Sequence, residues 1–210
     1  MLHTFGRSAI PLSGVILDKA GKLYGTTQYD GVFNCIAGSG CGTIYKLARV
    51  GTSWKFSTIH VFRYGDGAYP EANLVMDSAG NIYGTSNGGG GTYSRGVAFK
   101  LSPTKTGWTE TVLHVIGAPG DGSNPSTVVF DNQGNLFGSV PSSTNANDEF
   151  QNGFVFKLSR QPNGTWSEKI VYGSRTTNAA PFPNSNLIWN SCRTALIGTT
   201  GPYSDPAGAV

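Results

Sequence analysis

Residues 70–86 read PEANLVMDSAGNIYGTS, and residues 96–101 read GVAFKL. Both segments recur in two further copies, at residues 11–27 with 42–47 and at residues 125–139 with 153–158. A degraded fourth copy of the first segment occupies residues 183–200. One anchor position recurs at intervals of 59, 54 and 59 residues, and it holds Asp18, Asp77, Asp131 and Asn190. A long period of this kind indicates a repeat architecture.

Each copy contains four short segments that predict β-strands. In the first copy they are residues 15–18, 23–26 and 43–47, and a fourth, 58–62, that follows Trp54. All are rich in β-branched and aromatic residues, and Gly, Asn, Asp and Pro separate them. The first two are joined by Asp-x-x-Gly, which is typical of a tight turn with a glycine in the left-handed region. Turn geometry therefore explains the repeated aspartate.

Four antiparallel strands per module predict an all-β, β-propeller-like fold with three and a half to four blades in one domain, residues 1–210. The modules are residues 6–62, 63–116, 117–172 and 173–210, with residues 1–5 added to the last. Residues 1–5 resemble the outermost strand, so one interpretation is a small ring that they close. The other is an incomplete propeller cut from a longer array. A β-solenoid ranks below both, because its coils are shorter and its hairpins rarer.

Composition excludes several classes of protein. Charged residues make up 13% of the chain, against 30 glycines and 11 prolines, which argues against helices with charged exposed faces. The 15 basic residues are scattered, so no nucleic-acid surface is predicted. No apolar stretch reaches membrane-spanning length, so no membrane insertion is predicted.

Three motifs carry a family resemblance. Gly-Asp-Gly-x-x-Pro begins at Gly65 and Gly120, Asp-x-x-Gly-Asn-[Leu/Ile]-[Tyr/Phe]-Gly at Asp77 and Asp131, and Gly-x-[Val/Ala]-Phe-Lys-Leu at Gly96 and Gly153. The chain resembles the GloVer tandem-repeat family of bacterial secreted or surface-anchored proteins. The resemblance implies an extracellular or cell-surface location, with the export signal outside these residues. The chain departs from the pattern before Pro11, where Gly-Asp-Gly is missing, and at Asn190 and Arg193 in the last turn.

The cysteines and histidines have structural interpretations. Cys35 and Cys41 lie in one Gly-rich loop and are expected to form a disulfide, which suits an exported protein. A zinc site there would need two more ligands, and none is evident nearby. Cys192 is expected to be unpaired. The three histidines, His3, His60 and His114, share one position of the outermost strand, so they are expected to lie too far apart for a common metal ion.

No catalytic residue and no cofactor is predicted. Asp66 and Asp121 lie in the Gly-Asp-Gly turns, where satisfying turn N–H groups is favoured over binding Ca²⁺, the one alternative cofactor. None of the four glutamates, Glu71, Glu110, Glu149 and Glu168, is expected in a paired acid and base context. The chain also has no nucleophile elbow, zinc-protease helix or phosphate loop.

Variable loops on one face of a propeller favour a non-catalytic binding module for carbohydrate or a surface protein. The candidate ligand-binding residues are Tyr29, Asp30, Asp66, Asn87, Tyr93, Arg95 and Asp121. One alternative is a polysaccharide-acting hydrolase or lyase on a propeller scaffold. The other is a purely structural repeat of a larger surface protein.

Overall fold

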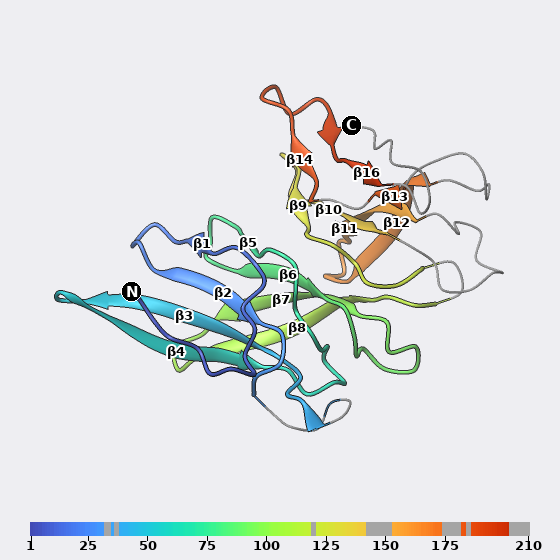
Figure 1. Cartoon of the computed structure of the whole chain (residues 1–210). Helices are drawn as coiled ribbons and strands as arrows, with labels where there is room; N and C mark the ends of the chain where they lie inside the picture. Colours follow the sequence, from blue (N-terminus) through green and yellow to red (C-terminus); the bar gives the residue numbers. More distant parts are fainter. Residues whose placement is uncertain are drawn as a thin grey trace.

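The fold is all-β, as the repeat predicts. The structure is a computed structural model, and it describes residues 1–31, 35, 38–118, 121–141, 153–173, 182–183 and 186–201. Three four-stranded antiparallel sheets follow one another along the chain, and Figure 1 shows the first two lying against each other. The described residues include no α-helix. Hence none of them contributes a helix long and apolar enough to cross a membrane.

Each of the three sheets consists of one copy of the repeat, with its strands side by side in chain order. The first sheet contains β1 (Ile16–Leu17), β2 (Leu23–Thr27), β3 (Thr43–Val50) and β4 (Ser53–Val61). The second contains β5 (Val75–Met76), β6 (Ile82–Ser86), β7 (Val97–Pro103) and β8 (Trp108–Val115). The third contains β9 (Val129–Phe130), β10 (Leu136–Val140), β11 (Phe154–Arg160) and β12 (Trp166–Gly173).

The fourth module forms two separate strand pairs. β13 (Phe182–Pro183) pairs with β16 (Thr200–Gly201), and β14 (Ile188–Trp189) pairs with β15 (Leu196–Ile197). The first strands of all four modules, β1, β5, β9 and β14, border a common opening of about 730 Å³. The sheets therefore turn their first strands inward and their long last strands outward, although closure into a ring is not shown.

The N-terminal segment packs on the first sheet. Residues 1–5 form no strand. The His3 ring stacks on Phe56 of β4 with centroids 4.1 Å apart, and the Phe5 ring lies 4.9 Å from that of Tyr45. The segment thus covers the face of the first sheet that no preceding sheet covers. Its predicted pairing with the fourth module is not observed among the described residues.

Side-chain hydrogen bonds of the anchor aspartates hold the hairpin turns, as predicted. Asp77 Oδ1 accepts the N–H groups of Ala79 and Asn81 at 2.9 Å, and Oδ2 accepts the Tyr83 hydroxyl at 3.1 Å. The aspartates of the other two sheets accept equivalent N–H groups. Burial alone would raise the pKa of Asp77, but bonds from Asn81 and Tyr83 outweigh it and lower the pKa. This contribution to stability is therefore present above pH 3.8, the ordinary pKa, and is lost as the pH falls further.

Removing this turn carboxylate should destabilise the second sheet. Asp77→Ala leaves four donors without their acceptor, among them the Asn81 side-chain amide, and we expect a loss of about 2 kcal/mol in urea unfolding. The fourth module suggests the rescue, because its Asn190 accepts N–H groups while its amide donates to Thr194 Oγ1. Asp77→Asn combined with Asn81→Thr should therefore recover most of the loss. Equal losses in the two variants would show that charge, and not turn geometry, is the requirement.

The recurring Gly and aromatic positions of the motif face each other across neighbouring strands. Gly84 of β6 pairs with Phe99 of β7. A Cβ on Gly84 would lie 2.7 Å from Phe99 Cζ and 2.9 Å from Leu74 Cδ2, so the ring occupies the space left by the missing side chain. The same arrangement joins Gly25 to Tyr45 and Gly138 to Phe156. Phe99 and Phe156 are fully buried and Tyr45 is nearly so, so each of these rings is part of the core that its sheet covers.

Equivalent positions of the four modules form a chain of hydrogen bonds along the inner edge. The Gly14 N–H donates to Asn73 Oδ1 at 2.6 Å, and the Asn73 N–H donates to Thr127 Oγ1 at 3.0 Å. The Thr127 hydroxyl in turn donates to Asn186 Oδ1 at 2.6 Å. Each bond crosses from one module to the next, so the inner edge sets a regular spacing between modules.

Candidate functional site

One histidine and two carboxylates meet between the first and second sheets. His60 comes from β4, Asp66 from the turn that follows β4, and Glu110 from β8. His60 Nε2 lies 3.6 Å from Asp66 Oδ2 and 3.4 Å from Glu110 Oε2. The other Asp66 oxygen accepts the Arg63 N–H at 2.7 Å, which orients the carboxylate. We call this group the first cluster.

The same three residue types meet between the second and third sheets. His114 of β8, Asp121 of the next turn and Glu168 of β12 form this second cluster. His114 Nε2 lies 3.3 Å from Asp121 Oδ2 and 3.6 Å from Glu168 Oε2. In each cluster one donor atom per residue lies within 4.8 Å of the other two. Both clusters therefore follow from the repeat.

A β-bulge allows β8 to contribute to both clusters. Glu110 and His114 are four residues apart, and in a regular strand they would point to the same face. Two neighbouring residues of β7 pair with Val112 and His114, which leaves Leu113 as an extra residue. The bulge reverses the alternation, so Glu110 reaches the first sheet and His114 reaches the third. β4 and β12 carry the same irregularity.

The N-terminal face of the first sheet has different residues at all but one of these positions. Phe56 follows Trp54 by two residues, as Glu110 follows Trp108. Arg7 precedes Pro11 by four residues, as Asp66 precedes its own proline. Only the histidine persists, as His3, and it stacks on Phe56. Where the glutamate is lost, an aromatic contact replaces the polar cluster.

Burial and crowding shift the titration of both clusters. Burial, together with the charge of Asp66, raises the pKa of Glu110 to about 8. Burial likewise raises the pKa of Glu168 to about 7. Burial also lowers the pKa of His60. It opposes the charged form of His114 too, but Asp121 and Glu168 outweigh it and raise the pKa of His114.

This arrangement corrects one sequence prediction. The expectation that no glutamate lies in a paired context is wrong for Glu110 and Glu168, because each lies with an aspartate and a histidine. The expectation that the histidines lie apart holds for His60 and His114, which belong to different clusters. The signal was present in the sequence: a glutamate follows the tryptophan by two residues only in the copies that come after a Gly-Asp-Gly turn.

The predicted ligand-binding residues do not form one site. Asp66 and Asp121 belong to different clusters. The Tyr29 ring lies 5.4 Å from that of Tyr69, whose carbonyl accepts the Asn87 N–H. Asp30, next to Tyr29, accepts the N–H of Gly31, and Tyr93 and Arg95 flank Gly117. The Arg95 carbonyl accepts the N–H of Asn124 at 3.4 Å.

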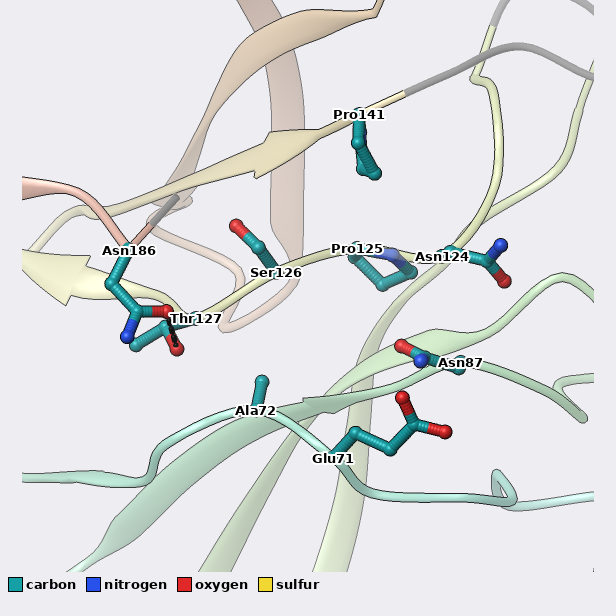
Figure 2. Close-up of a pocket in the computed structure, with 9 residues that line it drawn as sticks. All are labelled: Glu71, Ala72, Asn87, Asn124, Pro125, Ser126, Thr127, Pro141 and Asn186. Carbon is teal, nitrogen blue, oxygen red and sulfur yellow. Dashed lines mark hydrogen bonds between the residues drawn. The ribbon is translucent and has the colours of Figure 1, made fainter. Parts of the chain in front are cut away.

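Asn87 lines a recess between the second and third modules. The recess has a volume of about 230 Å³, and Figure 2 shows the Glu71 carboxylate directed toward Asn87. One Glu71 oxygen accepts a bond from Gln28 Nε2. Among the described residues, the side-chain amides of Asn87 and Asn124 make no hydrogen bond. The lining residues are Glu71, Ala72, Asn87, Asn124, Pro125, Ser126, Thr127, Pro141 and Asn186.

The predicted disulfide is present. Cys35 and Cys41 are bonded, with Cα atoms 5.2 Å apart, and both lie in the core between the first two sheets. Cys192 is a free and exposed thiol, as expected.

Comparison with known proteins identifies a family for this chain but does not show its function. A crystal structure of a protein of unknown function from Dyadobacter fermentans DSM 18053 matches with a TM-score of 0.41 and 9% identity, over 78% of this chain and 60% of that chain. The chain thus spans less than two thirds of that protein. At this TM-score and identity, the similarity supports no conclusion about fold or function. No curated protein matches. The Gloeobacter/Verrucomicrobia repeat matches residues 2–208, and the chain therefore belongs to the Gloeobacter/Verrucomicrobia repeat family.

Proposed function

We propose that this chain is a non-catalytic binding module of an exported bacterial protein, and that the recess between its second and third modules receives a hydroxyl-rich ligand such as a glycan. One observation carries the proposal. Glu71, Asn87 and Asn124 come from three separate segments. The second Glu71 oxygen and the side-chain amides of both asparagines make no hydrogen bond to a described residue. Amide and carboxylate groups of this kind pair well with sugar hydroxyls, because together they donate and accept.

The size and charge of the recess narrow the ligand class. Its volume of about 230 Å³ lies below the roughly 300–1,000 Å³ of pockets for drug-sized ligands. One sugar unit of a longer chain suits that volume. Glu71 is the only charged residue among the lining residues and it is acidic, so a neutral glycan suits the recess better than an anionic polymer.

A binding role agrees with the distribution of carboxylates. Glycoside hydrolysis uses two carboxyl groups that flank the scissile bond, and Glu71 is the one acidic residue that lines the recess. The clusters do bring carboxylates together, but they lie between sheets and recur at both interfaces. Recurrence marks them as part of the scaffold rather than as one active site.

Export and ring closure belong to the same proposal. The Cys35–Cys41 disulfide favours an oxidising compartment, outside the cell or at its surface. The common opening bordered by β1, β5, β9 and β14 favours a propeller-like arrangement around one axis.

Glycan-array screening of the chain, followed by calorimetry with the best oligosaccharide, tests the binding site. We expect Asn87→Ala and Asn124→Ala each to weaken binding by about tenfold, the effect of about one lost hydrogen bond. Gln133→Ala is the matched control, since this amide is exposed in a distant turn. Unchanged affinity in both recess variants, or no glycan bound at all, would reject the recess. Release of shortened sugars would instead favour the hydrolase or lyase alternative.

A further inference from the structure

We propose that each His–Asp–Glu cluster is a binding site for a divalent first-row transition-metal ion of the zinc type, held between two consecutive sheets. The chain would then bind two such ions, one at His60, Asp66 and Glu110 and the other at the second cluster. This inference is independent of the glycan proposal, because the recess shares no residue with either cluster.

The donor set suits zinc better than calcium. One imidazole nitrogen and two carboxylate oxygens are ligands that Zn²⁺ accepts, and three protein ligands leave a fourth position for water. Ca²⁺ takes six to eight oxygen ligands, and these clusters offer fewer oxygens together with a nitrogen. Two sheets supply the ligands of each site, so an ion would join β4 to β8 at one interface and β8 to β12 at the other.

The distances fit a shared ion better than direct hydrogen bonds. The Nε2–oxygen separations are 3.6 and 3.4 Å in the first cluster and 3.3 and 3.6 Å in the second. An N–H···O hydrogen bond would bring these atoms to about 2.7–3.2 Å. Two ligands of a tetrahedral ion, each bonded at about 2.0–2.2 Å, lie about 3.3–3.6 Å apart. In both clusters the histidine-to-carboxylate separations have that spacing, and the three donor atoms all lie within 4.8 Å of one another.

Both clusters also contain buried polar atoms that make no hydrogen bond to any described residue. His60 Nε2, Glu110 Oε1 and His114 Nε2 are buried and make no hydrogen bond among the described residues. The Glu110 side chain is only 10% exposed. Buried polar atoms are almost always hydrogen-bonded, and an ion or water that pairs with the group is one established reason for an exception. Here they gather at two equivalent positions of the repeat.

The N-terminal face of the first sheet supplies an internal comparison. If His60 and its counterparts served only to pack the sheets, the carboxylates could vary independently. Instead both are absent together, with Arg7 at the aspartate position and Phe56 at the glutamate position. The remaining His3 stacks on Phe56, an arrangement that leaves no set of three ligands. The ligand set is therefore complete at two interfaces between sheets and absent at the N-terminal face, where only the histidine remains.

Titration of the metal-stripped full chain with ZnCl₂ tests the proposal. We expect calorimetry and equilibrium dialysis to give two ions per chain. Glu110→Gln and Glu168→Gln should each leave one ion, and the double variant none. Glu71→Gln is the matched control and should keep two. MnCl₂ should compete for the same sites, and CaCl₂ should displace less than a tenth of the zinc at equal concentration.

A folding readout accompanies the titration. Zinc should raise the Tm of the unmodified chain, raise it less in either single variant, and leave the double variant unchanged. If a glutamine variant fails to fold, Asp66→Asn and Asp121→Asn provide the same test, since an asparagine at 66 can still accept the Arg63 N–H. No saturable zinc binding, or two ions bound by the double variants, would overturn the proposal.

Discussion

Gly96→Ala is expected to destabilise the chain by at least about 3 kcal/mol, a large part of the stability of a typical domain. Gly96 has a φ of +113°, a conformation that residues with a side chain rarely adopt. An added Cβ would lie 2.1 Å from the Ser86 carbonyl oxygen and 3.0 Å from Pro125 Cδ of the next module. The first neighbour is backbone and cannot move aside without breaking the pairing of β6 with β7.

Gly107→Ala is the matched control for this substitution. Gly107 has no atom within 4 Å of an added Cβ, and its φ lies outside the left-handed region. Urea unfolding should therefore show less than about 0.5 kcal/mol of change for the control. A loss below about 1 kcal/mol for Gly96→Ala would contradict the left-handed conformation of Gly96 and its close approach to the Ser86 carbonyl.

Phe99→Ala is expected to cost about 3–5 kcal/mol, because it opens a cavity where three strands meet. Phe99 is fully buried, and its ring lies over Gly84 and 5.3 Å from the ring of Phe62. Phe99→Leu fills more of the same space and should cost less. The measurement is urea unfolding followed by circular dichroism.

A double-mutant cycle separates this ring contact from general loss of packing. Gly84→Ala alone should destabilise, because its methyl group meets the Phe99 ring at 2.7 Å. In a Phe99→Leu background the same methyl group enters freed space. The two substitutions should therefore couple by about 0.5–3 kcal/mol, with the double variant more stable than the sum predicts. Additive effects would show that the ring does not fill the glycine position.

Local chemistry made the sheets predictable from the sequence. The turn between the first two strands depends on Asp77 and residues within six positions of it, so its geometry is encoded in one short segment. The disulfide likewise closes a short loop from Cys35 to Cys41. Closure into a propeller could not be predicted in this way, because it depends on the sum of the angles between successive sheets along the chain.

The clusters were not predicted from the sequence, because their residues come from different sheets and a β-bulge separates Glu110 from His114 in β8. His60 and Glu110 are 50 residues apart, and simple alternation assigns Glu110 and His114 of β8 to one face. The extra residue Leu113 sends them to opposite faces. His60 and His114 do lie apart, but each meets one carboxylate from the turn that follows it and one from the next sheet. Pairing within modules could be read from the sequence, whereas contact between modules required the structure.

The central claim is that the repeat places metal-binding residues between consecutive sheets. Anomalous diffraction at the zinc edge, from crystals of the full chain grown with ZnCl₂, tests it most directly. We predict two strong peaks, one within about 2.0–2.2 Å of the donor atoms of His60, Asp66 and Glu110, and one equally placed in the second cluster. No peak should lie between His3 and Phe56. Well-ordered crystals with zinc bound elsewhere, or with both clusters empty, would contradict this picture.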